Sequence, residues 1–215
     1  MEARIITLFG HLHSEQMARR CIRSANIPVQ PFNAVRPEQA ESFLEALGLE
    51  WTWGLGYGPM EHKPYGGNEL ARKACFLSHY KLWQFCAYLG EPILILEHDA
   101  IFVRPFEAFD FDAICMINDP RRATPRGGWW YEQMCARGSG IWPKTAIFDD
   151  SRPDGLAGNS AYLIQPHAAQ RLLEITKEVG AWPNDALICR QLIDGLQEVY
   201  PFITEVQAGQ STIQC

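Results

Sequence analysis

The stretch "EPILILEHDAIF", residues 91 to 102, places an unbroken apolar run directly before an acid, a histidine and a second acid. Because the run does not alternate with polar residues, it fits a central strand that is covered on both faces. In open α/β sheets, ligands bind at the carboxyl ends of such strands. The stretch therefore predicts a buried strand that presents Glu97, His98 and Asp99 at a binding edge.

The segments before this strand alternate between strand and helix. Residues 4–9 and 27–35 have the apolar character of strands, and helices are expected from about Ser14 and from Pro37. A long helix from Asn68 to Gly90 then leads into the central strand. This order is typical of a parallel sheet covered by helices. We therefore expect an α/β fold with a mostly parallel central sheet.

The second half of the chain is less regular. After a strand at 112–118, residues 118–158 show no clean periodicity and predict a loop-rich segment. A stretch of this length usually forms a functional lid, or else contains elements that the pattern does not reveal. A strand is expected at 160–165, helices at 166–180 and 182–195, and then a short strand with an irregular end.

Composition narrows the class of protein. The chain has 215 residues, 47% of them hydrophobic and 20% charged, which suits one globular domain over residues 1–215. A net charge of −6 offers no basic field for a phosphate backbone, so no nucleic acid partner is expected. No apolar run reaches the length of a signal core or a transmembrane segment, which predicts a cytoplasmic protein. The seven cysteines lack zinc-site spacing and are expected to be reduced.

The two acids after the central strand suggest a metal site. Two carboxylates one residue apart repel each other unless a cation lies between them. Glu97 and Asp99 offer hard oxygen ligands, which favour Mn²⁺ or Mg²⁺, and such ions often bridge a protein to a diphosphate. A solvated turn is the alternative. His98 could instead balance the negative charge of the two acids without a metal. Alternatively, it could point into the core, because neighbouring residues of a strand face opposite sides.

Several motifs in order identify a resemblance. "ELARKACFLSHYKLWQFC", followed by "EPILILEHDAIF", resembles glycosyltransferase family 25, the lipooligosaccharide glycosyltransferases, with their Gly-Cys-x-x-Ser-His-x-x-x-Trp helix and Leu-Ile-Leu-Glu-Asp-Asp-like strand end. "FNAV", "AYLIQPHAAQRLL", "PND" and "STI" also match in order. The resemblance implies a Rossmann-like fold of the glycosyltransferase A type, Mn²⁺, and a UDP-sugar donor, usually UDP-galactose or UDP-glucose. It also implies inverting transfer to a glycan acceptor, and a lipid-linked acceptor would bring the protein to a membrane surface.

The resemblance also assigns roles to residues. Glu97 and Asp99 match the metal-binding acids, and Asp185 matches the acid of the Pro-x-Asp motif and is the candidate catalytic base. Two positions depart from the family: His98 replaces an acid, which lowers the local negative charge, and Ala74 replaces a glycine. Cys75, Ser78 and His79 match the helix motif. The donor-binding candidates are Thr7, Ala34, Val35, Arg36, Lys73, Ser78, His79, Glu97, His98 and Asp99.

Acceptor binding is assigned to the loop-rich segment and to the turn that follows it. The candidates are Trp129, Trp130, Asn159 and Ser160, since aromatic rings can stack on a sugar and small polar groups can bond its hydroxyls. Arg19 and Arg20 are further candidates for the diphosphate, besides Arg36 and Lys73.

Each role has a structural alternative. Asp185 or its neighbour could cap a helix, His79 could be a satisfied core histidine, and the tryptophans could be ordinary core. At the level of function, the alternatives are a catalytically inactive relative that binds sugar or assembles with partners, and a metal-dependent phosphohydrolase. The phosphohydrolase is disfavoured because the sequence has no second cluster of His and Asp for a second metal.

Overall fold

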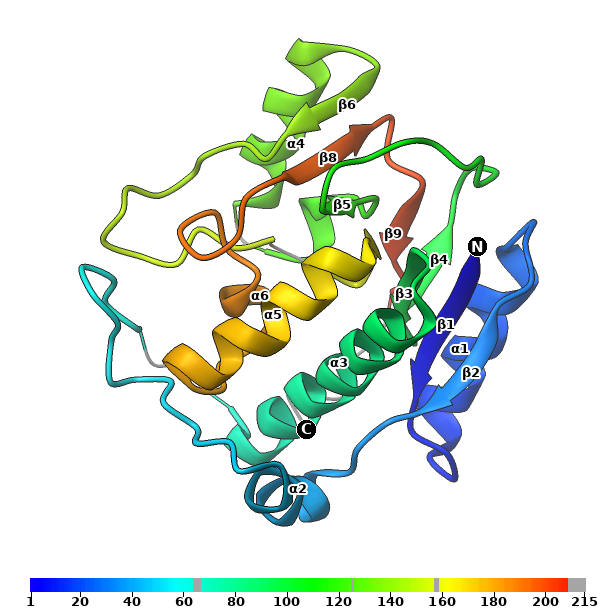
Figure 1. Cartoon of the computed structure of the whole chain (residues 1–215). Coiled ribbons are helices and arrows are strands. Elements are labelled where there is room, and N and C mark those ends of the chain that lie inside the picture. Colours follow the sequence, from blue (N-terminus) through cyan, green and yellow to red (C-terminus); the bar gives the residue numbers. More distant parts are fainter. Residues whose placement is uncertain (64–66, 125, 157–158, 209–215) are drawn as a thin grey trace.

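The computed structural model describes residues 1–63, 67–124, 126–156 and 159–208 (Figure 1), so the "STI" motif lies outside the described residues. The strands of the main sheet run in the order β2-β1-β3-β7-β5-β8-β6. They are β1 (Glu2–Thr7), β2 (Gln30–Asn33), β3 (Ile93–Glu97), β5 (Ile114–Met116), β6 (Gly140–Pro143), β7 (Ala161–Ile164) and β8 (Leu196–Tyr200). A small second sheet pairs β4 (Ala100–Phe102) with β9 (Thr204–Val206).

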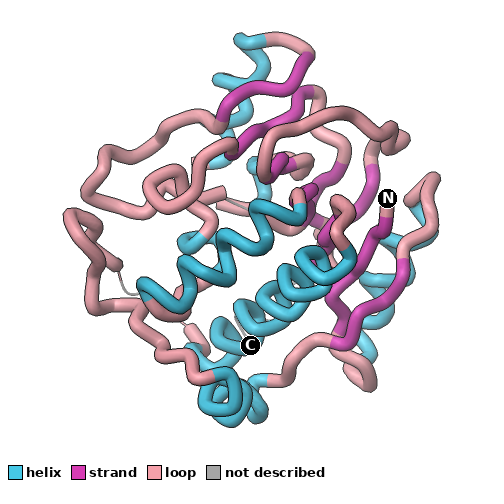
Figure 2. The backbone as a smooth tube through the Cα atoms, viewed as in Figure 1, coloured by secondary structure: helices cyan, strands magenta, loops and turns pink. Residues whose placement is uncertain are grey.

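Helices cover both faces of the main sheet (Figures 1 and 2). They are α1 (Leu12–Ser24), α2 (Ala40–Leu47), α3 (Glu69–Leu89), α4 (Gly127–Arg137), α5 (Pro166–Val179) and α6 (Asn184–Leu187), with short 3-10 helices at Pro37–Gln39 and Pro120–Arg122. The predicted α/β fold with a central sheet flanked by helices is confirmed.

The central strand β3 is buried as its apolar run predicts, and it joins two cores. Ile93 and Ile95 face α3 and α5, whereas Leu94 and Leu96 face α1 and the β4 side. All four side chains are fully buried. Burial of each such side chain stabilises the fold by about 1.5–3 kcal/mol. Alternate residues of the unbroken run therefore contribute to the hydrophobic core on each of the two faces of the sheet.

The sheet is mixed rather than mostly parallel. β1 runs parallel to β2 and β3, and β5 runs parallel to β8, but β7 is antiparallel to both β3 and β5, and β6 is antiparallel to β8. A strand that is buried on both faces has an unbroken apolar run whether it pairs parallel or antiparallel to its neighbours. The sequence pattern therefore locates β7 without revealing its direction.

The helix that positions the site has the predicted ends. The Asn68 side chain accepts a hydrogen bond from the backbone N–H of Ala71 at 3.2 Å, which caps α3. Gly90 closes it in a left-handed conformation with φ 71°. The sequence signals were thus sufficient for both ends of α3.

The segment 118–158 contains α4 and β6, two elements that the sequence pattern does not reveal, and most of its other described residues lie outside helices and strands. The prediction of a helix at 182–195 was wrong, because only the four-residue α6 forms there. α6 ends because the backbone groups that would continue it form hydrogen bonds with a neighbouring segment. Leu156 N–H donates to Ile188 O at 3.2 Å, and Arg190 N–H donates to Asp154 O at 3.3 Å. This pairing is long-range, so no local pattern predicts it.

Candidate functional site

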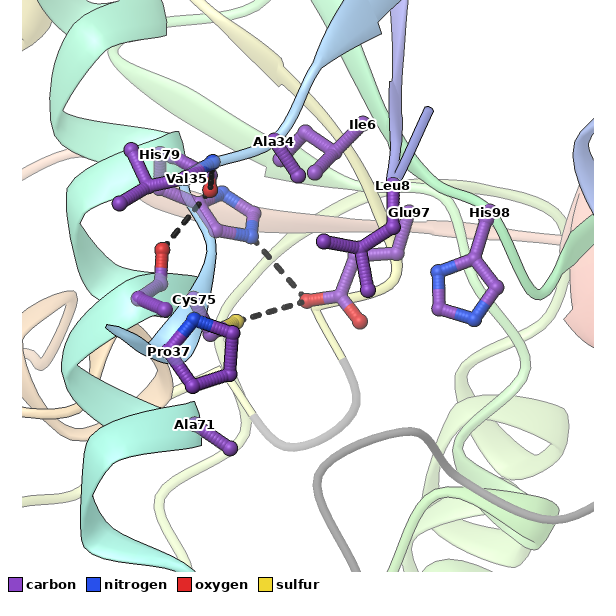
Figure 3. Close-up of a pocket in the computed structure, with 12 residues that line it drawn as sticks. Ile6, Leu8, Ala34, Val35, Pro37, Ala71, Cys75, His79, Glu97 and His98 are labelled. Atoms are coloured by element: carbon purple, nitrogen blue, oxygen red, sulfur yellow. Dashed lines mark hydrogen bonds and ion pairs between the residues drawn. The ribbon is translucent and has the colours of Figure 1, made fainter. Parts of the chain in front are cut away.

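A pocket lies at the carboxyl ends of β1 and β3, beside α3 (Figure 3). It encloses about 60 Å³. Predicted donor-binding residues form much of its wall, namely Ala34, Val35, Ser78, His79, Glu97 and His98. The rest of the wall is largely apolar: Ile6, Leu8, Pro37, Ala71, Ala74 and Cys75. The structure therefore brings these sequence-predicted residues together at the expected edge of the sheet.

Ser78 holds the wall of this pocket in place. Its hydroxyl donates to the Ala74 carbonyl at 2.8 Å and accepts from the Val35 backbone N–H at 2.9 Å. Both groups are buried, so the bonds tie the chain after β2 to α3. The Ser78 hydroxyl therefore bonds the backbone of two segments, and its predicted contact with the donor stays a prediction.

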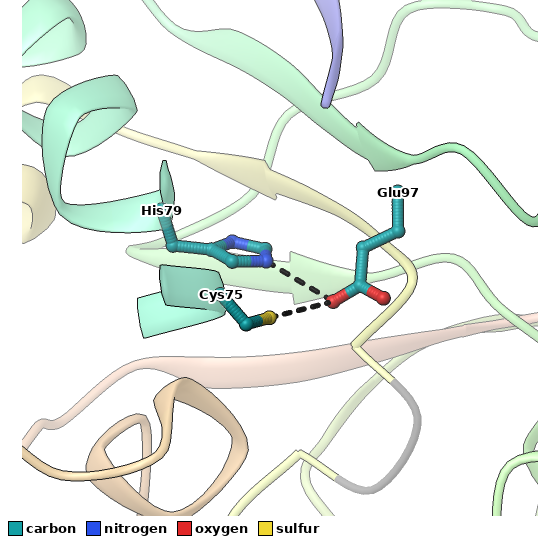
Figure 4. Close-up of side chains that lie close together, drawn as sticks. All are labelled: Cys75, His79 and Glu97. Atoms are coloured by element: carbon teal, nitrogen blue, oxygen red, sulfur yellow. Dashed lines mark hydrogen bonds and ion pairs between the residues drawn. The ribbon is translucent and has the colours of Figure 1, made fainter. Parts of the chain in front are cut away.

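His79 and Cys75 project from α3 toward Glu97 at the end of β3 (Figure 4). His79 Nε2 lies 3.1 Å from Glu97 Oε1, and Cys75 Sγ lies 3.9 Å from the same oxygen. Burial alone would raise the pKa of Glu97, but the hydrogen bond from His79 and the nearby His98 lower it below its ordinary value. Glu97 is therefore held as a carboxylate inside a largely buried site.

The chain turns directly after Glu97, which changes the expected direction of His98. A turn at residues 98 and 99 ends the strand alternation, so His98 lines the same pocket as Glu97 rather than pointing into the core. Burial lowers the pKa of His98, and the charges of His11 and His13 lower it further although Glu97 opposes them. His11 and His13 precede and begin α1, so they also lie near this edge.

Asp99 is the second acid of the site. Burial and the charge of Glu97 raise its pKa to about 7. Its Oδ1 atom is buried and, among the residues that the structure describes, has no hydrogen-bond partner. A buried carboxylate beside a second one, with an oxygen left unpaired, fits a divalent cation. Glu97 and Asp99 are the residues that would hold it.

A second set of ligand atoms lies close by. Atoms of Cys75, His79 and Glu97 lie within 4.8 Å of one another. A thiol and an imidazole favour a softer ion such as Zn²⁺. The choice between the two sets depends on which nitrogen of His79 carries the proton.

Asp185 and its neighbours close the site from the other side. Asn184 Oδ1 lies 3.4 Å from Cys75 Sγ, and its Nδ2 donates to Asn159 Oδ1 at 3.2 Å. Burial and the charge of Glu97 raise the pKa of Asp185 to about 6, although backbone N–H groups of the first turn of α6 bond its carboxylate. Asp185 is therefore a carboxylate near Glu97 that also accepts helix N–H groups, and its role as catalytic base stays a prediction.

Asn159 and Ser160 lie closer to the donor candidates than predicted. The Ser160 carbonyl accepts the Glu97 backbone N–H at 2.7 Å, and its hydroxyl bonds Asp99. Asn159 is buried and bonds Asn184. These two residues support the acids, and their assignment to the acceptor stays a prediction.

The predicted cations do not face the pocket. Lys73 Nζ lies 2.6 Å from Glu41 and 3.0 Å from Glu69, so these two carboxylates already balance the charge of the lysine. Arg36 bonds the carbonyl of Phe9. Arg19 pairs with Glu15 and is exposed, as is Arg20. The buried Thr7 hydroxyl donates to its own strand at Ile5 O.

The tryptophan pair is divided between core and surface. Trp130 is completely buried in the core beneath Lys144, whose Nζ lies 4.8 Å from the ring centroid. A buried ring cannot stack on a sugar, so its assignment to the acceptor was wrong, and the ordinary core role holds. Trp129 is 45% exposed and remains available.

The sequence interpretation missed Asn184, Tyr162 and Trp83 as residues of the site. Each lies within a motif block that was recognised, "PND", "AYLIQ" or the α3 motif, so a signal existed. Asn184 contacts Cys75, Tyr162 contacts His79, and Trp83 contacts Tyr162; each contact joins two elements, and local spacing does not show it.

Within the described residues, no helix is both long and apolar enough to cross a membrane. No curated protein matches the sequence. Among solved structures, the glycosyltransferase GlyE of Streptococcus pneumoniae TIGR4 is 12% identical, with a TM-score of 0.41, over 93% of this chain and 46% of that one. Mouse xyloside xylosyltransferase 1 is 10% identical, with a TM-score of 0.41, over 87% of this chain and 80% of that one.

The chain thus spans about half the length of the GlyE chain, and similarity at this level supports no statement about activity. The match to a family model is more direct. The model of glycosyltransferase family 25 (LPS biosynthesis protein) matches residues 11–119, which include α3, Glu97 and Asp99. Because this match covers more than half of the chain, the protein belongs to glycosyltransferase family 25.

Proposed function

We propose that this protein transfers a hexose, galactose or glucose, from a UDP-sugar to a saccharide hydroxyl with inversion, and that it requires Mn²⁺ or Mg²⁺. The observation that carries the proposal is the pair of carboxylates at the end of β3, Glu97, which lines the pocket, and Asp99, which follows in the turn. Asp99 has a raised pKa and an unpaired buried oxygen, as expected of a cation ligand without its cation.

The apolar wall of the pocket suits the base of the nucleotide. Ile6, Ala34, Val35 and Pro37 offer a surface for a flat ring, and Ser78 holds that wall against α3. When bound, a divalent cation would neutralise the charge that develops on the leaving diphosphate. Glu97 and Asp99 would hold the cation and so fix the donor at the sheet edge.

Asp185 would serve as the general base. In an inverting transfer, the acceptor oxygen attacks the anomeric carbon, the bond to the UDP oxygen breaks, and the acceptor proton passes to a carboxylate. Asp185 is near enough to Glu97 for their charges to interact, and its pKa of about 6 suits proton acceptance near neutral pH. Its conjugate acid would then release the proton to solvent.

Calorimetric titration tests the donor site. UDP-galactose and UDP-glucose, each with and without Mn²⁺, are titrated into the wild type, Asp99→Asn and the distant control Gln170→Leu. We expect binding that requires Mn²⁺, is lost in Asp99→Asn and is retained in the control. Equal binding by wild type and Asp99→Asn, or none by any of the three, would contradict the proposal.

The inactive-relative alternative rests on His98, which takes the place of an acid in the family motif. A sugar-binding or assembly module would bind the donor and transfer nothing to any acceptor. Release of UDP in the presence of a saccharide acceptor, measured on the same preparation, separates the two functions.

A further inference from the structure

Trp83 and Tyr162 form a buried hydrogen bond behind the site. Trp83 Nε1 lies 2.9 Å from the Tyr162 hydroxyl oxygen, and both side chains are fully buried. An indole nitrogen can only donate. The tyrosine oxygen is therefore the acceptor, and its own proton must go to another partner.

His79 Nδ1 is that partner, 2.9 Å from the same hydroxyl. Burial raises the pKa of Tyr162 well above its ordinary value, so the hydroxyl keeps its proton. If Nδ1 also carried a proton, the tyrosine oxygen would receive two donors and its O–H would have no acceptor. A buried polar group left unpaired costs about 1–3 kcal/mol. The arrangement therefore selects a neutral imidazole with its proton on Nε2.

The Nε2 proton is then directed at Glu97 Oε1, 3.1 Å away. The nearest approach of Cys75 to Glu97 is to this same oxygen (Figure 4). Among the described residues, no hydrogen bond reaches Glu97 Oε2. One oxygen of the carboxylate is thus engaged by the protein, and the other is left for a ligand.

We propose that Trp83 and Tyr162 are positioning residues, which fix His79 as the Nε2–H tautomer so that His79 orients Glu97 with Oε2 toward the cation and donor. What Glu97 binds rests on the function proposed above. The tautomer also decides between the two sets of metal ligands. A protonated Nε2 has no lone pair for a metal, so this tautomer disfavours a zinc site formed by Cys75, His79 and Glu97.

Nitrogen NMR reads the tautomer directly. In protein labelled with ¹⁵N-histidine, long-range ¹H–¹⁵N spectra at about pH 8, without metal or donor, distinguish the two neutral tautomers and the cation. The chain has six histidines, and the pattern absent from His79→Gln identifies His79. We expect the Nε2–H pattern. An Nδ1–H tautomer or an imidazolium at His79 would overturn the proposal.

Variants then test the consequence for Glu97. Tyr162→Phe removes the proton donor, and Trp83→Phe leaves the hydroxyl free to accept from Nδ1, so each should weaken the tautomer preference. Loss of such a supporting contact typically lowers metal affinity by about 10–100-fold. We expect at least the lower value for Mn²⁺, with a smaller change in kcat at saturating Mn²⁺ and donor. If Tyr162→Phe does not fold, Trp83→Phe provides the test.

Rescue and control variants separate positioning from general damage. Gln at position 79 can donate to Glu97 and accept from Tyr162, so His79→Gln should retain clearly more Mn²⁺ affinity than His79→Leu. Thr176→Val removes another buried hydroxyl, which bonds Leu172 O in α5, and should leave Mn²⁺ affinity unchanged. Equal affinity in His79→Gln and His79→Leu, or an equal loss in Thr176→Val, would overturn the proposal.

The two proposals fail in different ways. If the wild type binds neither Mn²⁺ nor a UDP-sugar, the proposed function and the role of Glu97 fail, whatever the tautomer. If the wild type binds both but His79 is not the Nε2–H tautomer, only the positioning proposal fails.

Discussion

Asp99 is the residue whose ionisation controls the candidate metal site. Its pKa is raised to about 7 by burial and by the charge of Glu97, so the metal-free site holds a proton there below that pH. A cation must displace this proton. Metal affinity should therefore depend on pH in the range where Asp99 titrates.

We expect Mn²⁺ affinity to rise by about 10-fold per pH unit below pH 7 and to level off above it. Isothermal titration with Mn²⁺ between about pH 5.5 and 8.5 measures this. Asp99→Asn has no such proton and should bind weakly without this dependence. A wild-type affinity that does not change with pH would contradict the assignment of Asp99 as a ligand.

Asp185 makes a separate prediction about rate. Asp185→Asn should lower kcat by about 10²–10⁴-fold and leave the KM for the donor nearly unchanged, because a general base acts on the acceptor proton. Its pKa is raised to about 6, so wild-type kcat should rise with pH through 6 as the carboxylate loses its proton. Steady-state kinetics with a saccharide acceptor test both. An unchanged kcat would show that Asp185 has only the helix-end role.

At the scale of elements, a segment between β6 and β7 positions α6. Lys144 Nζ lies 2.7 Å from Asp154 Oδ1, and Arg190 Nε lies 2.9 Å from Asp154 Oδ2. Lys144 and Asp154 are almost completely buried, and breaking such a pair typically costs about 3–5 kcal/mol. This ion cluster holds residues 144–156 against the chain that follows Asp185.

Gly155 is the point of closest approach in this segment. A Cβ at this position would lie 1.7 Å from the Asp185 carbonyl oxygen, so Gly155→Ala must displace the backbone of Asp185. A misplacement of about 1 Å can cost about 100-fold in rate. We expect a loss of kcat of that order, measured in the same kinetic assay, with donor affinity much less affected.

Gly128→Ala is the matched control, because a Cβ there meets nothing within 4 Å and α4 favours alanine over glycine. It should keep the wild-type kcat. If both variants lost activity equally, close packing at Gly155 would not be the cause.

The limits of sequence interpretation also show at this scale. The ends of α3 follow from Asn68 and Gly90, which are local signals. The end of α6 is set by backbone bonds to residues 154–156, and α4 begins with two glycines and has no side-chain hydrogen bond at its N-cap. Elements defined by their own capping residues were predicted, whereas elements that end against a distant segment were not.

At the scale of the whole molecule, a residue far along the chain holds the turn that carries the acids. The Gln207 side chain donates to Met17 O and Ala100 O, each at 3.0 Å, and its backbone N–H donates to Asp99 O at 2.7 Å. Gln207 is buried beside the pairing of β4 with β9. The C-terminal part of the described chain therefore fixes the position of Asp99.

Gln207→Leu keeps the side-chain volume and removes the side-chain hydrogen bonds to Met17 O and Ala100 O, whereas the backbone bond to Asp99 O remains. The carbonyls left unpaired should reduce the free energy of unfolding by about 1–3 kcal/mol, and the looser turn should weaken Mn²⁺ binding several-fold. Urea unfolding and Mn²⁺ titration measure the two effects. Gln170→Leu, on the exposed face of α5, should change neither. Weaker stability with unchanged Mn²⁺ affinity would show that other contacts hold Asp99.

The sequence by itself determined the α/β class, the central strand β3, the bounds of α3 and the grouping of Glu97, His98 and Asp99 at one edge. These features depend on apolar runs, capping residues and strand ends, which are local. Only the tertiary structure decided the direction of β7, the burial of Trp130, the pairing of Lys73 and the contacts of Tyr162 with His79. Each of these depends on which distant segment lies alongside, and the hydrogen bonds and burial that follow are properties of the folded chain as a whole.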